Sequence, residues 1–367
     1  MTIQEEIQAY KQVFVVCDRN VGAFAHMLGD YPLLTIAASE ETKTMDTVVN
    51  ICRWLLEKGA DRGALVLAVG GGVTTDMVGF AASIYKRGIA YANFPTTLLG
   101  MVDAGLGGKT GVNLDSYKNI LGVIRQPEFT FMFADVLRSL PRKEFMSGAA
   151  EMLKSFIISN KSDDYERAVK LLRHYAITGE SPANTTEGLN ELSALITDAS
   201  QVKRDIVDKD PYENGERRKL NLGHTWAHAI EWWQRTIPLE AAPSVCPQED
   251  PAVQSPPTCT HVESAAPVHP VCPHGEYSAK THPVYTHGEA VAIGIVQAAL
   301  KAEEMGIADE GLAGKIKSDF ASCGLPTELP CPIGELEAAM HKDKKTEGDK
   351  IRFVLPVRIG KVVVKLL

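Results

Sequence analysis

The chain contains 367 residues, of which 45% are hydrophobic and 23% charged, and its formal net charge is −8. This length predicts a large core and two domains, and the acidic balance argues against binding to nucleic acid or to an anionic membrane. No apolar run is long enough to span a bilayer, and residues 2–6 lack a signal-peptide pattern, so we expect a cytoplasmic protein. The seven cysteines include no C-x-x-C pair, which argues against a disulfide framework and a structural zinc site.

Short apolar strands alternate with helical patterns in the first part of the chain. The run Ala64–Val69 is continuously apolar, which is typical of a strand buried in a parallel sheet. The alternation predicts a doubly wound, Rossmann-like α/β domain over residues 1–140, with ligands at the carboxyl ends of its strands. Strands are expected at 14–18, 33–37, 64–69 and 91–94, and helices at 22–28, from 43 to 58 and from 73 onwards.

The strand signal fades after Pro141, and residues 141–367 predict a mainly α-helical domain. Residues 238–285 are rich in Pro, Ser, Thr, Cys and His without periodicity, which predicts a mobile insertion. Three cysteines recur in it at thirteen-residue spacing, wider than zinc ligand pairs use, so a surface insertion is favoured over an additional metal site. Helices are expected within 144–236, at 288–306 and at 311–322, and a strand pair at 351–355 and 361–364.

Histidines and a glutamate at helix starts indicate a metal site. His224 and His228 are four residues apart, with Glu231 three further on, so a helix would place all three on one face. Such a pair is also typical of a polar helix face, but His287 and Glu151 each open a further helical pattern. Glu151, His224 and His287 could supply the three ligands of a catalytic metal site, leaving His228 as an acid or base.

Two glycine-rich segments suggest sites for phosphate. Gly70–Gly72 separates a buried strand from a helix, where backbone N–H groups and the helix dipole favour an anion, although a tight turn with positive φ would need the same residues. A second glycine-rich turn at 103–111 carries Lys109 and is followed by Lys118 and Asn119. Lysine beside flexible backbone suits a phosphate or a substrate anion, and a solvated loop lysine is the alternative.

A series of short motifs runs in a fixed order between about residues 14 and 365. The motifs occupy Gly70–Phe80, Pro95–Leu99, Val102–Asn113, Lys118–Asn119, Leu140–Glu144, Gly148–Lys154, Asn221–Glu231, His287–Val291 and Asp343–Lys345. Together they resemble the 3-dehydroquinate synthase family, whose members use NAD and a divalent metal. The segment before His287 is several times the usual family length.

The resemblance implies a role for each matching residue. Glu151, His224 and His287 resemble the ligands of zinc or cobalt, and Arg87 resembles an arginine that reaches the neighbouring active site of a homodimer. Positions that match NAD contacts are Asp18, Glu40, Lys43, Gly71, Gly72, Val73, Asp76, Thr96, Thr97, Asp103 and Lys118. Positions that match the substrate pocket and its catalytic groups are Lys109, Lys118, Asn119, Lys154, Lys203, Glu213, Arg217, Asn221, His228 and Lys344.

The implied reaction converts 3-deoxy-D-arabino-heptulosonate 7-phosphate to 3-dehydroquinate and phosphate, through transient oxidation by NAD⁺, elimination, reduction and aldol closure. A sister sugar phosphate cyclase acting on sedoheptulose 7-phosphate or glucose 6-phosphate is the nearest alternative. Those substrates lack a carboxylate, so Arg217 and Lys203 favour the shikimate-pathway substrate. A metal-dependent polyol or glycerol phosphate dehydrogenase would not need Lys109 and Lys118. A catalytically silent scaffold that binds metal through its Cys/His-rich segment would not need the intact ligand set and lysines elsewhere in the chain.

Overall fold

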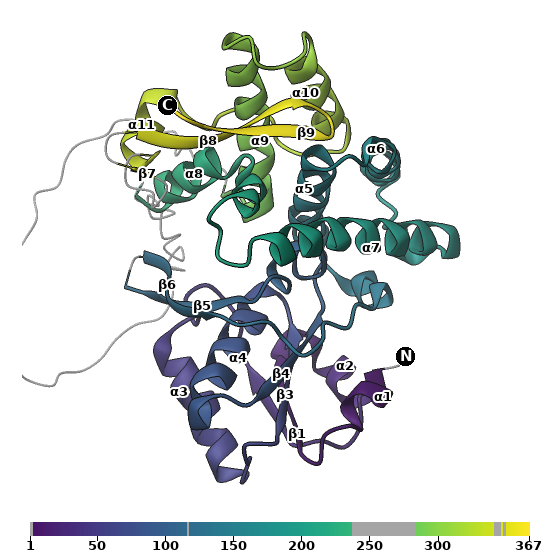
Figure 1. Ribbon diagram of the computed structural model, residues 1–367. Helices are drawn as coiled ribbons and strands as arrows, with labels where there is room; N and C mark the ends of the chain where they lie inside the picture. The colour runs from purple at the N-terminus through teal and green to yellow at the C-terminus, as the bar shows by residue number, and fades with distance from the viewer. Residues whose placement is uncertain (1–2, 116, 237–283, 341–345, 348–349) are drawn as a thin grey trace, which may run out of the picture.

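The structure, a computed structural model, describes residues 3–115, 117–236, 284–340, 346–347 and 350–367. An α/β part contains the amino terminus, and a mainly helical part packs on one end of it (Figure 1). The predicted α/β fold with a helical second part is confirmed. Lys344 and nearly all of the predicted insertion at 238–285 lie outside the described residues.

Four parallel strands form the sheet of the α/β part, in the order β2-β1-β3-β4. The strands are β1 (Val13–Asp18), β2 (Leu33–Ile36), β3 (Leu65–Gly70) and β4 (Ala90–Pro95). Side chains alternate between the two faces, so Phe14 and Val16 enter one core whereas Val13, Val15 and Cys17 enter another. Because both faces are buried, the strands read as continuous apolar runs, as the sequence predicts.

Helices cover both faces of this sheet. On one face lie α3 (Met45–Glu57) and α4 (Gly72–Ile84), and on the other lie α1 (Ile3–Ile7) and α2 (Gly22–Met27). Thr44 begins α3 by accepting a hydrogen bond from the Thr47 backbone N–H, a common helix N-cap. Short helical turns complete this part at η1 (Arg19–Val21), η2 (Tyr85–Arg87), the π-helical η3 (Gly100–Ala104) and η4 (Ala134–Ser139).

An antiparallel hairpin corrects the prediction of a glycine-rich loop around Lys109. Lys109 begins β5 (Lys109–Leu114), which pairs with β6 (Tyr117–Ile124). Gly111 lies opposite Gly122 in this hairpin, and glycine weakens the strand signal that a sequence pattern carries. The hairpin lies between the parallel sheet and the helical part (Figure 1). Its Lys109 and Lys118 reach across to Glu213 and Glu231 of the helical part.

The helical part closes with a small antiparallel sheet of order β7-β8-β9. The predicted helices and the closing strand pair are confirmed, and β7 adds a short third strand. The helices are α5 (Arg142–Ile158), α6 (Ser162–Thr178), η5 (Pro182–Asn184), α7 (Thr186–Lys209), η6 (Glu216–Asn221), α8 (His224–Thr236), α9 (His287–Glu304), α10 (Leu312–Ser322) and α11 (Ile333–Met340). The strands are β7 (Thr346–Glu347), β8 (Lys350–Arg358) and β9 (Lys361–Leu366). Among the described residues, no helix combines the length and apolarity needed to cross a membrane.

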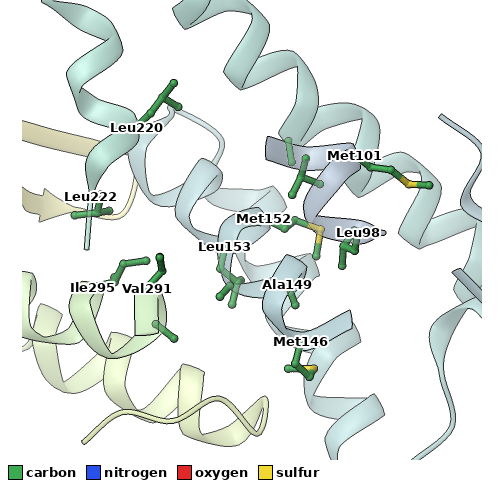
Figure 2. Packing of buried hydrophobic residues seen from close by; sticks show 14 of the residues in the cluster. Leu98, Met101, Met146, Ala149, Met152, Leu153, Leu220, Leu222, Val291 and Ile295 are labelled. Carbon is green, nitrogen blue, oxygen red and sulfur yellow. The ribbon is translucent and has the colours of Figure 1, made fainter. Parts of the chain in front are cut away.

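One hydrophobic core joins the two parts. Leu98 and Met101, which follow β4, are fully buried in the same cluster as Met152 and Leu153 of α5 (Figure 2). This cluster continues to Ile295 of α9 and to the closing sheet. The carboxyl edge of the parallel sheet is therefore held against α5 by continuous apolar packing.

Candidate active site

Glu151, His224 and His287 converge from three different helices. His224 and His287 begin α8 and α9 as predicted, but Glu151 lies in the middle of α5 and does not open a helix. Each offers one ligand atom, and these atoms lie within 4.8 Å of one another. The Nε2 atoms of His287 and His224 lie 3.4 Å and 3.6 Å from Oε1 of Glu151. Glu151 is fully buried, and its carboxylate forms an ion pair with the buried ammonium group of Lys154.

The residues on either side of His287 explain why its side chain lies next to Glu151. Thr286 caps α9 by accepting from the Glu289 N–H, while the Glu289 carboxylate accepts from the Thr286 N–H, so His287 is fixed as the first helical residue. The next residue, Gly288, donates its N–H to Ser147 Oγ on α5 at 3.0 Å. A Cβ at Gly288 would overlap the Ser147 backbone, so only glycine allows α9 to begin this close to Glu151.

The donor set fits a divalent cation. Two imidazoles and one carboxylate are the ligands of many catalytic zinc sites, which keep a further position open for water or substrate. His224 Nδ1 lies 3.1 Å from the Leu222 carbonyl oxygen, so that nitrogen is the donor, and Nε2, which faces Glu151, is the atom that would bind metal. Burial favours the neutral ring of His287, but Glu151 and Glu231 outweigh it and raise the pKa of His287 to about 10. A cation bound to Nε2 would replace that proton.

His228 lies next to this cluster but does not belong to it. Its ring packs edge-to-face against His224, with the ring centroids 5.6 Å apart. The residue follows His224 by one helical turn on α8, as its spacing predicts. An acid–base role for His228 thus stays a prediction. The contact between the rings of His228 and His224 is compatible with that role.

Two buried lysines and one aspartate connect the metal cluster to the α/β part. Lys154 contacts Glu151 as an ion pair, and its Nζ lies 3.7 Å from Asp103 Oδ1. Lys203 donates to the backbone oxygen and to Oδ1 of Asp103 at 2.8 Å and 2.5 Å. Loss of water would raise the pKa of Asp103, but the two ammonium groups hold it well below its usual range.

The two lysines respond differently to this environment. Burial would lower the pKa of Lys154, but the Glu151 and Asp103 carboxylates outweigh it and raise that pKa. Burial dominates at Lys203, where Asp103 compensates only in part, and the pKa of Lys203 is lowered. Lys154 is therefore a fixed cation beside the metal cluster, whereas Lys203 loses its proton more readily.

Lys109, Glu213 and Asn221 form a second polar group. Lys109 pairs with Glu213 across the two parts of the chain, and the Asn221 side-chain amide donates to the same carboxylate. Glu213 has a φ of 61°, an unusual backbone conformation for a non-glycine residue that is often kept at functional sites. Three residues predicted from the sequence to line the substrate pocket are thus brought together.

A third group lies between α3, α4 and the hairpin. The buried Lys43 ammonium donates to Asp76 Oδ2 at 2.5 Å and to Asn119 Oδ1 at 2.7 Å. Loss of water raises the pKa of Asp76 to about 6, although Lys43 opposes the shift. Asn119 has a φ of 52°, and its backbone N–H donates to Asn113, whose side chain also donates to Glu40. Four residues predicted to contact NAD or substrate therefore share one hydrogen-bonded chain.

The remaining predicted NAD contacts lie at the carboxyl edge of the sheet. Asp18 ends β1 and accepts from the Asn20 N–H at 3.1 Å, while Thr96 and Thr97 follow β4. Gly71, Gly72 and Val73 join β3 to the start of α4. None of Gly70–Gly72 has positive φ, so a turn requirement does not explain them. A Cβ at Gly72 would instead lie 2.7 Å from the Ala104 Cβ, so this glycine allows close packing of α4 on η3.

Arg217 is buried, and its guanidinium is turned towards the backbone. One terminal nitrogen donates to the Pro211 carbonyl at 2.5 Å and the other to the Gly107 carbonyl at 2.8 Å. Its Nε has no hydrogen-bond partner among the residues described. The predicted two-pronged contact with a substrate carboxylate would require the guanidinium to leave these carbonyls, whereas a single contact through Nε would not.

Arg87 is exposed and lies at the end of η2, just before the amino end of β4, whereas Glu151, His224 and His287 belong to α5, α8 and α9 of the helical part. Lys86 and Arg87 have positive φ values of 48° and 71° in succession. Strained backbone of this kind persists where surrounding structure or function demands it. The predicted contact of Arg87 with a neighbouring subunit is untested by a single chain.

Asn113 and Glu231 are the two residues of these networks that were not among the predicted site residues. Asn113 joins Glu40 to Asn119, and no sequence pattern marks it beyond its place in a matched motif. Glu231 is seven residues after His224, which puts it on the same helix face, and that spacing was sufficient to find it.

Replacing residues 240–282 with a short Gly/Ser link is expected to leave turnover and catalytic metal content nearly unchanged. Gln234 and Tyr285 exchange two hydrogen bonds, so the chain departs and returns at neighbouring points. The entropic cost of closing a loop changes by only roughly 0.6 kcal/mol for each doubling of its length. Metal per chain and phosphate release are measured. Loss of one metal equivalent with activity intact would reveal a second site, and loss of the catalytic metal would show that the replaced segment positions His287.

The family comparisons cover most of the chain. The family model described as 3-dehydroquinate synthase N-terminal matches residues 33–147, and that described as 3-dehydroquinate synthase C-terminal matches 148–239 and 269–346. The chain is 33% identical over 337 residues to 3-dehydroquinate synthase of Dictyoglomus thermophilum, covering 90% of this chain and 77% of that protein. It is 35% identical over 343 residues to the Acidithiobacillus ferrooxidans enzyme of the same name, covering 91% and 78%.

Solved structures show the same fold. The structure of 2-epi-5-epi-valiolone synthase from Streptomyces hygroscopicus subsp. jinggangensis, with NAD⁺ and Zn²⁺ bound, matches with a TM-score of 0.72 and 25% identity, over 98% of this chain and 88% of that chain. A 2-deoxy-scyllo-inosose synthase complexed with carbaglucose-6-phosphate, NAD⁺ and Co²⁺ matches with a TM-score of 0.73 and 23% identity, over the same shares. Both family models and the sequence relatives agree, and the chain belongs to the 3-dehydroquinate synthase family.

Proposed function

We propose that this chain catalyses the conversion of 3-deoxy-D-arabino-heptulosonate 7-phosphate to 3-dehydroquinate and inorganic phosphate. The observation that carries this proposal is the convergence of Glu151, His224 and His287 beside the buried lysines Lys154 and Lys203. A metal site next to the fixed cation of Lys154 suits a substrate that has both a reacting hydroxyl and a phosphate leaving group. Membership of the family supports the same reaction.

The cofactor sites use residues already described. Glu151, His224 and His287 would hold zinc or cobalt, and the carboxyl edge of the sheet with Asp18, Gly72 and Asp76 would hold NAD. When bound, NAD⁺ would accept and later return a hydride at C5 of the substrate, and the cation would lower the pKa of the C5 hydroxyl. Lys154 would stay protonated beside that hydroxyl and stabilise negative charge there.

Elimination of phosphate requires a base and a site for the leaving anion. His228, one helical turn after His224, is our candidate for moving the proton, and the substrate's own phosphate is the alternative. Lys109 and Lys118 of the hairpin, together with Lys344, would hold the phosphate as negative charge accumulates on it. Glu213 would orient Lys109 through their ion pair, and Asn221 would hold Glu213 in place by donating to its carboxylate.

A sister cyclase reaction on sedoheptulose 7-phosphate or glucose 6-phosphate is the second candidate. The observation that favours it is the guanidinium of Arg217, whose two terminal nitrogens donate to backbone carbonyls. An arginine engaged in this way is a weaker sign of a substrate carboxylate than the sequence alone suggests. Sequence identity of about one third to 3-dehydroquinate synthases favours the first candidate.

Phosphate release separates the candidates. The purified chain is given catalytic NAD⁺, Zn²⁺ or Co²⁺, and each of the three sugar phosphates in turn. We expect 3-deoxy-D-arabino-heptulosonate 7-phosphate to be turned over with a kcat/KM on the order of 10²-fold or more above the others. A reversed order would identify a sister cyclase. Absence of phosphate release from every sugar would favour a catalytically silent metal-binding scaffold.

We also propose that two copies of the chain form a homodimer in the cytoplasm, with Arg87 of each copy completing the phosphate site of the other. Support for this arrangement comes from the exposure of Arg87 and its place before the amino end of β4, whereas the predicted NAD contacts lie at the carboxyl edge of the sheet. The paired positive φ values at Lys86 and Arg87 support it further, because such strain is often kept for function.

A further inference from the structure

Glu231 on α8 is buried at 7% exposure and touches two groups that come from different parts of the chain. Its Oε1 lies 3.1 Å from Nδ1 of His287, the metal ligand at the start of α9. The same Oε1 lies 3.3 Å from Nζ of Lys118, which β6 of the hairpin carries. One carboxylate oxygen therefore faces both a predicted metal ligand and a predicted substrate-binding lysine.

We propose that Glu231 is a positioning residue that orients His287 for the metal and couples metal binding to the state of Lys118. The inference rests on the proposed metal-dependent function. Glu231 is not itself a ligand, because its oxygen faces Nδ1 of His287 whereas Nε2 faces Glu151.

The orienting role follows from hydrogen-bond chemistry. A carboxylate can only accept, so Nδ1 of His287 donates to Glu231, and a cation at Nε2 would take the place of the proton on the side that faces Glu151. His224 has a corresponding partner, but there it is the neutral carbonyl oxygen of Leu222. A charged acceptor increases the basicity of the imidazole more than a carbonyl does, so His287 should depend more strongly on its partner.

The coupling follows because Lys118 and His287 share one oxygen of the Glu231 carboxylate. While Lys118 lies against Oε1, part of the negative charge of Glu231 is directed to the ammonium group rather than to His287. A substrate phosphate that draws Lys118 away would leave the full charge to the imidazole and strengthen the metal bond. Linkage requires the reverse effect as well, so a bound metal should favour the state in which Lys118 is released to phosphate.

Metal affinity measured without turnover tests the orienting role. Dissociation constants for Zn²⁺ and Co²⁺ are obtained by competition with a chromophoric chelator for the full chain, Glu231→Gln and Glu335→Gln. We expect Glu231→Gln to weaken metal binding about 10- to 100-fold, because loss of a ligand's hydrogen-bonding partner has that typical cost. Glu335→Gln is the matched control: Glu335 also accepts a hydrogen bond from α8, at Trp233 Nε1, but contacts none of the metal ligands.

A double-mutant cycle tests the coupling. Lys118→Met should tighten metal binding about 5-fold or more, and this gain should disappear in the Glu231→Gln background. Lys109→Met removes the same charge from the same hairpin, but its partner is Glu213, so its effect should stay within about two-fold. A gain that persists without Glu231 would mean that the lysine acts on the metal directly, and it would overturn the coupling.

Outcomes for the two proposals differ. Absence of Zn²⁺ and Co²⁺ binding by the unmodified chain would overturn the proposed function, and this inference with it. Normal binding by the unmodified chain and by Glu231→Gln alike would overturn only the inference. If Glu231→Gln does not fold, Glu231→Asp, which keeps the charge but shortens its reach, takes its place in both measurements, with the same weakening expected and an unchanged affinity contradicting it.

Discussion

Glu151→Gln and His224→Ala should each remove the catalytic metal and lower kcat on the order of 10³-fold or more, because a bound cation supplies several kcal/mol of charge stabilisation. Glu151 lies at the centre of the cluster, since the Nε2 atoms of both histidines lie within 3.6 Å of its Oε1. Glutamine keeps the shape of the side chain but neither its charge nor its full ability to accept, so most of the fold should persist. Metal content after gel filtration, circular dichroism and phosphate release are measured together.

His228→Ala is the matched control for these variants. His228 is on the same helix as His224 and packs against it, but it is outside the ligand cluster. We expect the variant to keep its metal and to lose about 10²- to 10⁴-fold in rate, the usual contribution of a positioned acid or base. Full activity in a metal-free His224→Ala protein would contradict the site. Loss of metal from His228→Ala would instead make that histidine a ligand.

Mixing inactive Arg87→Ala with inactive Lys109→Ala should restore about one quarter of the activity, if the homodimer shares its sites. In a heterodimer, one pocket combines both lesions and the other has neither. Random exchange makes half of the dimers heterodimers, each with one intact pocket of two. The exposed position of Arg87 and the place of Lys109 beside Glu213 and Asn221 explain why both lesions should fall in the same pocket of the heterodimer and leave the other intact.

The control mixes Lys109→Ala with Lys118→Ala. Both lysines come from the same hairpin and serve the pocket of their own chain, so every pocket in the heterodimer has one lesion and no rescue is expected. Subunit exchange is verified with two differently tagged chains. Equal activity in the two mixtures would show that Arg87 acts within its own chain or outside the site altogether.

The buried parallel strands and the helices were predictable because they repeat one simple pattern. Ala64–Val69 is apolar at every position because β3 faces a hydrophobic core on both sides. The hairpin was missed for the opposite reason. Its paired glycines, Gly111 and Gly122, and the exposed side chains of β6 leave no alternation for a pattern to detect.

The metal ligands were predictable from spacing and motifs, but their neighbours were not. Only the folded chain shows that Lys118 lies against Glu231 across 113 positions of sequence, or that Lys109 meets Glu213 across 104. The surroundings of Arg217 were not predictable either. The sequence suggests a guanidinium available to a substrate carboxylate, but in the fold its terminal nitrogens donate to carbonyl oxygens. Contacts of this range depend on tertiary packing, which local patterns do not encode.

The core that Leu98 and Met101 share with α5 makes the sheet and the helices one cooperative unit of unfolding. Neither part can lose its packing without exposing the apolar surface of the other. A ligand that binds only the folded chain then stabilises all of it, by about 2.7 kcal/mol at a hundred times its dissociation constant. A cation held by Glu151, His224 and His287 would therefore contribute to the free energy of unfolding of β1 to β4, strands that it never touches. The chain would be most resistant to unfolding when it is loaded for catalysis.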